Sequence, residues 1–191
     1  MDHLKYATDF ALNGIDIYSS AGTFNKLKLK GHRFKGIKAL QQFNIGNFTI
    51  LPFDTQHDAA EPLGFLIQYN PTKERLLYAT DTYYIKYKFN KLNYLLIECN
   101  YNKEKAKENE QGRVINKTRY TRLLESHMSL ENLLKFLQAN DLRNVKNIIL
   151  CHLSNDNANE KIMKDRVFEQ TNITTDIARP GLILDLRLYP F

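Results

Sequence analysis

The chain has 191 residues, of which 43% are hydrophobic and 25% are charged. This size and composition are typical of one globular domain and exclude a two-domain enzyme with a full-sized cofactor domain. The sequence contains no apolar run of the roughly 18 residues that a membrane span needs, and no signal-peptide pattern at its start. Two cysteines, Cys99 and Cys151, are too few for a disulfide framework. We therefore expect a cytoplasmic protein in which both are small buried apolar residues.

Lysine and arginine outnumber aspartate and glutamate by 27 to 21, which gives a net charge of +6. A basic balance favours anionic partners such as nucleic acid. The basic residues are densest in one stretch around Phe34, which either contacts phosphates or forms a solvated face. They are Lys26, Lys28, Lys30, Arg33, Lys35 and Lys38. A second charged run, residues 103–122, mixes both signs and is typical of an exposed, mobile connection rather than a binding patch.

The first half of the chain predicts one helix followed by short strands. The helix covers residues 4–13 and ends before Gly14, a residue type that commonly follows a helix terminus. The strands have short alternating or apolar patterns bounded by polar residues. They cover residues 15–18, 48–53, 63–69, 75–79 and 92–98.

The second half predicts two more helices and two more strands. Residues 129–139 have leucines at helical spacing, with Ser129 able to cap the helix, and residues 159–170 form the next helix. Apolar strands are expected over residues 145–150 and 182–186. Because strands and helices intermingle, we predict an α/β or α+β fold with a mixed sheet.

Histidines and aspartates stand at the boundaries of these elements. Asp81 and His152 each follow a predicted strand, and His57 lies in the loop after another. Asp2 and His3 precede the first helix. Taken singly, each is also compatible with a turn former or a surface side chain. Imidazoles and carboxylates at strand ends can converge on one edge of a sheet, where they form a mixed nitrogen and oxygen site suited to zinc.

The order of these residues resembles the metallo-β-lactamase superfamily. Its pattern is His-x-His-x-Asp-His, then a later His, an Asp and a final His. Asp2 and His3 match the end of the first motif, and His57, Asp81 and His152 match the three later positions. The resemblance extends from Asp2 to about residue 186 and implies an αββα sandwich of two mixed sheets, as a single domain over residues 1–191.

A further motif narrows the resemblance to the phosphodiesterase branches, which include tRNase Z-like enzymes and exonuclease-like relatives. It is the Ser-His-Met-Ser stretch around His127. The resemblance implies a hydrolase with one or two Zn²⁺ ions, or Mn²⁺, that cleaves phosphodiester bonds in nucleic acid or cyclic nucleotides. Asp2 would assist the attacking water, and His127 would donate a proton to the leaving oxygen or stabilise charge. The metal ligands would be Asp2, His3, His57, Asp81 and His152.

Two departures from the family pattern leave alternatives open. The chain starts inside the first motif, so its first two histidines and the strands before them do not precede Asp2. We expect either an N-terminally truncated fragment or a natural short variant that completes its sheet with a partner chain, as in a homodimer. The sequence after Glu98 reads Asn-Tyr-Asn where relatives often carry Asn-His-Asp.

Two other functions compete with hydrolysis of phosphodiesters. A catalytically impaired or inactive family member would act as a binding or subunit protein. A lactamase or thioester hydrolase would share the fold, but the Ser-His-Met-Ser stretch argues against it.

Overall fold

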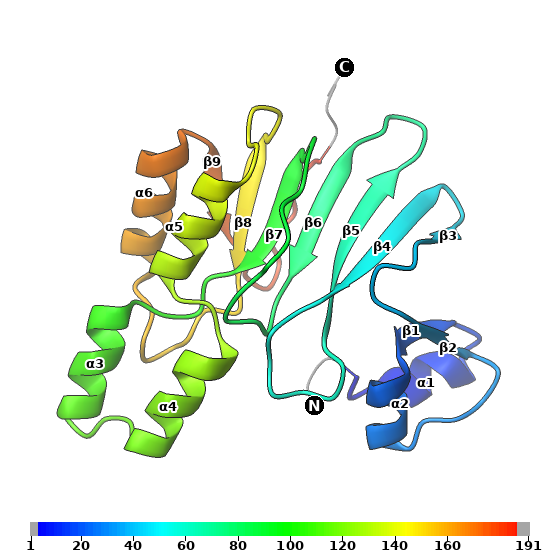
Figure 1. The fold of residues 1–191 in the computed structure, drawn as a ribbon, viewed down its shortest axis with the longest axis horizontal. Coiled ribbons are helices and arrows are strands. Elements are labelled where there is room, and N and C mark those ends of the chain that lie inside the picture. Colours follow the sequence, from blue (N-terminus) through cyan, green and yellow to red (C-terminus); the bar gives the residue numbers. More distant parts are fainter. Residues whose placement is uncertain (1–3, 187–191) are drawn as a thin grey trace.

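The computed structural model describes residues 4–186, and its centre is a seven-stranded mixed sheet (Figure 1). The strands lie in chain order across the sheet, from β3 to β9. They are β3 (Phe43–Ile45), β4 (Phe48–Asp54), β5 (Leu63–Tyr69), β6 (Arg75–Ala79), β7 (Tyr94–Glu98), β8 (Asn147–Cys151) and β9 (Thr174–Ile177). A separate sheet pairs β1 (Ile17–Ser20) with β2 (Phe34–Ile37) in parallel.

Six helices accompany these sheets in the described residues. They are α1 (Ala7–Leu12), α2 (Ala21–Leu27), α3 (Lys103–Gln111), α4 (Lys117–Ser126), α5 (Leu130–Ala139) and α6 (Glu160–Thr171). In Figure 1, α3 and α4 lie below α5 and α6 on one side, and α1 and α2 lie with the small sheet on the other. No helix in the described range 4–186 is long and apolar enough to span a membrane.

The large sheet changes character at β6. Neighbours from β3 to β6 pair antiparallel, whereas β6, β7, β8 and β9 pair in parallel. Parallel neighbours need a crossover, and here the crossovers carry the loop before β7, helices α3 to α5, and helix α6. The carboxyl ends of β6, β7 and β8 therefore meet at one edge of the sheet.

The core lies between the sheet and helices α5 and α6. Leu95 of β7 and Ile148 of β8 are fully buried, as are Leu133 of α5 and Met163 of α6. Burying a leucine or isoleucine contributes roughly 1.5–3 kcal/mol each. Ser129 caps α5 by accepting a hydrogen bond from the backbone N–H of Asn132, at 3.1 Å. The predicted amphipathic helix is thus confirmed, with its leucines against the sheet.

The α/β class and the mixed sheet are confirmed. The predicted sandwich of two full sheets is not observed in residues 4–186. The second sheet has only two strands of four residues each, and they pair with one another alone. On the large sheet, Ile67, Tyr78 and Leu96 lie on the face away from α5 and α6 and are only partly buried. The described residues thus contain one full sheet and one small one.

Most predicted elements are confirmed within a few residues, including the first helix, after which Gly14 has a φ of +86°. The strand predicted over residues 182–186 is wrong, because this segment pairs with no strand. The edge beside β8 is taken by β9, which follows α6 after only two residues and so reaches that edge first.

The prediction of a mobile connection over residues 103–122 is also wrong. This run forms α3 and α4, which contact each other. Asn116 caps α4 by accepting from the backbone N–H of Arg119, and Ala106 of α3 and Ile115 of the connection between the helices are buried. Few side chains of these two helices are buried, and their many exposed charged residues made the run resemble a connection in the sequence.

Candidate metal centre

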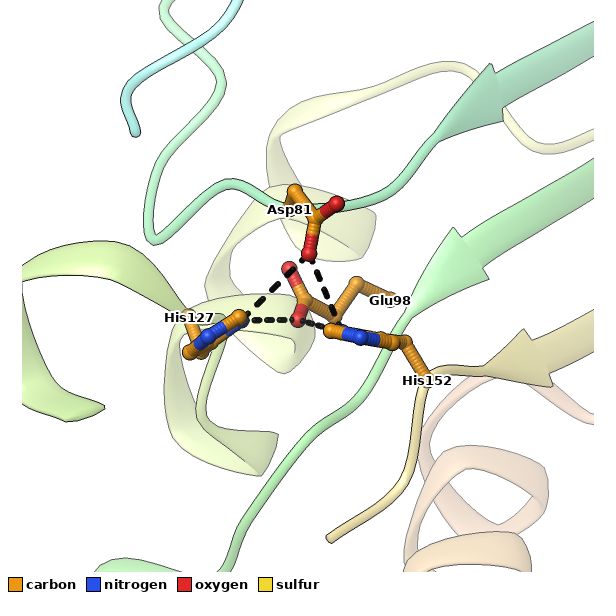
Figure 2. A group of neighbouring side chains, drawn as sticks. All are labelled: Asp81, Glu98, His127 and His152. Atoms are coloured by element: carbon orange, nitrogen blue, oxygen red, sulfur yellow. Dashed lines mark hydrogen bonds and ion pairs between the residues drawn. The ribbon is translucent and has the colours of Figure 1, made fainter. Parts of the chain in front are cut away.

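Four side chains converge at the edge of the sheet where the parallel strands end. Asp81, Glu98, His127 and His152 each offer one ligand atom, and these four atoms all lie within 4.8 Å of one another. Figure 2 shows the two imidazoles and the two carboxylates pointing toward a common centre. Among the residues that the structure describes, these four are the histidines and acids that lie close enough together to hold a metal ion.

The sheet topology explains why residues so distant in sequence meet here. Glu98 is the last residue of β7, His152 follows β8 directly, and Asp81 lies two residues after β6. Asp81 and His152 both adopt left-handed backbone conformations, with φ of +50° and +58°. Such conformations are uncommon for residues other than glycine and end each strand with a turn at the sheet edge. His127 comes from a different element, as the C-cap residue directly after α4.

Glu98 is the hub of the cluster and is completely buried. Its Oε1 lies 2.7 Å from Nδ1 of His127 and 2.8 Å from Nδ1 of His152, so one carboxylate oxygen faces both imidazoles. Its Oε2 accepts the backbone N–H of Thr82 at 2.7 Å. A buried carboxylate is costly unless it is paired and hydrogen-bonded, and Glu98 has partners on both oxygens.

Asp81 closes the cluster from the opposite side. Its Oδ1 lies 3.3 Å from Nδ1 of His152 and 3.8 Å from Nδ1 of His127. The carboxylates of Asp81 and Glu98 thus face the same two ring nitrogens. Two negative charges and two imidazoles in a space of this size match the donor set of a divalent cation site.

His57 lies beside this cluster rather than inside it. Its ring centre is 5.5 Å from that of His127, and its Nδ1 accepts the backbone N–H of Ala59 at 3.1 Å. The loop that carries it is held to the turn after β6, since the backbone N–H of Gln56 donates to the hydroxyl of Thr82. Burial lowers the pKa of His57 despite nearby carboxylates, so its imidazole is neutral at pH 7, the form that binds metals.

The structure brings together three of the residues that the sequence singled out, Asp81, His127 and His152, with His57 at their side. Asp2 and His3 lie outside the described residues. Sequence reasoning missed Glu98. A signal was present, because Glu98 ends an apolar strand with an acid, and an acidic residue at the end of a buried strand needs a partner.

The donor chemistry of the cluster fits a divalent cation. Carboxylate oxygens and imidazole nitrogens are ligands that zinc and manganese both accept. The second carboxylate oxygen of Glu98 accepts a hydrogen bond from the backbone N–H of Thr82. Hydrogen bonds of this kind, from residues that do not themselves bind the metal, orient metal ligands. The fit rests on these side chains, whose candidate ligand atoms lie within 4.8 Å of one another.

A cavity of about 640 Å³ opens beside the cluster, which is within the usual range for small-molecule sites. His127 and His152 form part of its wall, and α4, the loop after β8 and Asn100 after β7 form the rest. The other lining residues are Asn100, Arg119, Arg122, Leu123, Leu153, Ser154, Asn155, Asp156 and Asn157.

No protein-family model and no curated protein sequence matches the chain. Solved structures do match by shape. The metallo-β-lactamase fold protein YhfI from Bacillus subtilis is 15% identical with a TM-score of 0.67, over 95% of this chain and 72% of YhfI. A diphosphatase from the PhnP family is 15% identical with a TM-score of 0.55, over 96% of this chain and 64% of the diphosphatase.

Yeast PDE1 is 13% identical with a TM-score of 0.53, over 77% of this chain and 48% of PDE1. The chain thus spans between 48% and 72% of the length of these three proteins. Identities this low establish similarity of fold alone. The chain has a metallo-β-lactamase fold, with a cluster of histidines and acids at the carboxyl ends of its parallel strands.

Proposed function

We propose that the chain is a metal-dependent hydrolase that cleaves phosphodiester bonds in nucleic acid or cyclic nucleotides. The observation that carries the proposal is the convergence of Asp81, Glu98, His127 and His152 beside an open cavity. The structural neighbours support the choice of bond, since they include a phosphodiesterase and a diphosphatase.

Asp81, Glu98 and His152 would hold a Zn²⁺ or Mn²⁺ ion, with His57 available for a second ion. Asp2 and His3 remain proposed ligands of the first ion, and Asp2 the group that assists the attacking water. A divalent metal ion in such a site polarises a phosphoryl oxygen and lowers the pKa of water toward neutrality.

In this proposal His127 serves as the proton donor to the leaving oxygen. Its Nδ1 faces the buried carboxylate of Glu98 at 2.7 Å, which fixes the orientation of the ring. When Nδ1–H donates to Glu98, Nε2 is the nitrogen that exchanges a proton with the substrate. Glu98 therefore positions His127 and stabilises the positive charge that the imidazole gains when it is protonated.

The basic stretch over residues 26–38 favours nucleic acid over cyclic nucleotides as the substrate. Lys26, Lys28, Lys30 and Lys38 are exposed and have no ion-pair partner within the described range. Arg33 and Lys35 instead pair with Asp16. Exposed lysines without a protein partner remain free to contact phosphates.

The test compares bis(p-nitrophenyl) phosphate, single-stranded DNA and a cyclic mononucleotide as substrates in the presence of Zn²⁺ or Mn²⁺. We expect hydrolysis of the first two, and a loss of about 100-fold or more in His127→Ala, since general acid catalysis contributes about 10²–10⁴-fold. His32→Ala, a change at an exposed histidine outside the cluster, serves as the matched control with bis(p-nitrophenyl) phosphate. Metal binding without hydrolysis of any substrate would instead favour an inactive binding or subunit protein.

A further inference from the structure

Helix α4 presents two arginines to the cavity beside the candidate metal centre. Arg119 and Arg122 are three residues apart, so they lie on one face of the helix, and both line the cavity. His127 directly follows the same helix as its C-cap residue, belongs to the metal cluster and lines the same cavity. One short helix therefore places two positive charges and one candidate catalytic group around a single space.

Both arginines are paired, but their ion pairs are exposed. Arg119 lies 3.1 Å from Asp156 and Arg122 lies 2.9 Å from Asp58, with 61% and 69% of the arginine side chains accessible. Exposed ion pairs contribute little to stability because water screens them and both side chains lose freedom. A phosphate accepts bidentate hydrogen bonds from guanidinium, and a phosphomonoester also carries more charge than a carboxylate, so a bound phosphate can displace such partners.

The rest of the cavity wall indicates which part of a substrate it meets. Apart from two leucines, the lining consists of polar, charged and histidine side chains, and it includes no phenylalanine, tyrosine or tryptophan among the described residues. Recognition of single-stranded bases commonly relies on aromatic stacking. The chemistry of this wall suits the phosphates and sugars of a substrate rather than its bases.

We propose that Arg119 and Arg122 bind a second phosphate of the substrate, next to the phosphate that is cleaved. This inference rests on the proposed phosphodiesterase function and implies a preference for natural substrates with at least two phosphates. The second phosphate comes either from the next link of a nucleic acid strand or from a small nucleotide that carries two phosphate groups. A cyclic nucleotide with one phosphate leaves the arginines unused and is a poor substrate.

A matched pair of chromogenic substrates tests the role of the arginines. Thymidine 5′-(p-nitrophenyl phosphate) has one phosphate, and the same compound with an added 3′-phosphate has two, with the same leaving group. We expect Arg119→Gln and Arg122→Gln to lower kcat/KM about tenfold or more for the second compound and little for the first. Arg166→Gln on α6, an exposed arginine outside the cavity, is the control. Equal losses on both compounds would overturn the inference.

Asp156 separates anion binding from a purely structural role for Arg119. If Arg119 only ties α4 to the loop after β8, Asp156→Asn and Arg119→Gln break the same contact and change affinity in the same direction. If Arg119 binds phosphate, Asp156→Asn frees it and tightens binding, whereas Arg119→Gln weakens it. Opposite signs support the inference, and equal signs overturn it.

A binding measurement keeps the inference testable without hydrolysis. Fluorescence anisotropy of labelled oligothymidylate is measured in EDTA over a range of salt concentrations. Each lost phosphate contact should reduce the slope of log K against log salt by about 0.7. Unchanged slopes in Arg119→Gln and Arg122→Gln would overturn the inference, while absent hydrolysis with changed slopes would count against the proposed function alone. Competition by thymidine 3′,5′-bisphosphate distinguishes the sources: weak competition indicates a strand, and competition equal to that of oligothymidylate indicates a small nucleotide.

Discussion

Replacing Glu98 by glutamine removes the negative charge at the hub of the cluster and keeps the size of the side chain. Glu98 is fully buried and receives three polar contacts, from His127, His152 and the backbone N–H of Thr82, all at 2.7–2.8 Å. Glutamine has one acceptor oxygen instead of two. It cannot accept from Thr82 on one side and from the imidazoles on the other at the same time.

The expected effect on metal binding follows from these contacts. Changing a group that orients metal ligands typically costs 10–100-fold in metal affinity. That range corresponds to about 1.4–2.7 kcal/mol. Because Glu98 is also a proposed metal ligand, this range is a lower bound for the loss of affinity.

Isothermal titration of Zn²⁺ and Mn²⁺ into the metal-free protein measures this effect. Glu125→Gln is the matched control, because it makes the same chemical change at an exposed position on α4. Circular dichroism checks that both variants are folded. If Glu98→Gln binds metal within twofold of the unchanged protein, the buried carboxylate is not part of a metal centre and the reasoning is refuted.

Two further predictions concern packing and thiol chemistry. A Cβ atom on Gly64 would lie 2.4 Å from the ring of Phe53, so we expect Gly64→Ala to lower the free energy of unfolding in urea by about 1–3 kcal/mol. The control Gly36→Ala, where a Cβ atom has nothing within 4 Å, should lower it far less. Equal urea midpoints for the two variants would contradict this prediction. Burial raises the pKa of Cys151 to about 12 and also raises the pKa of Cys99, so both thiols stay protonated at pH 8. Both should react with dithiobis(nitrobenzoate) only slowly in the folded protein and rapidly after unfolding in guanidinium. Fast labelling of the folded protein would refute this prediction.

Much of the large sheet could be predicted because its strands are apolar and short, and burial in the core dictates that pattern. The helices α3 and α4 could not be predicted in this way, because most of their residues are exposed and each helix buries only one residue. The edge strand β9 was missed for a related reason. It contains Thr174, Thr175 and Asp176, while the more apolar segment 182–186 forms no strand. Pairing depends on which segment reaches the free edge, and local sequence does not record that.

The candidate site shows the same division. Asp81 and His152 could be found because each lies within two residues of the end of an apolar strand, where the sequence predicts the end of the sheet. Glu98 was overlooked as part of the strand itself. Arg119 and Arg122 were assigned to a solvated connection, because their place beside the cluster depends on how α4 packs across the end of the sheet. Local pattern reveals strand ends, whereas the tertiary arrangement decides what surrounds them.

The most direct test of the account is the dependence of phosphodiester hydrolysis on metal in the unchanged chain and in Asp81→Ala. Bis(p-nitrophenyl) phosphate hydrolysis is measured after EDTA treatment and during stepwise return of Mn²⁺ or Zn²⁺. We expect activity to disappear with EDTA and to return as the metal binds, and we expect Asp81→Ala to bind metal weakly and to remain inactive. Activity that survives both EDTA and the loss of Asp81 would contradict the assignment of this cluster as a catalytic metal centre.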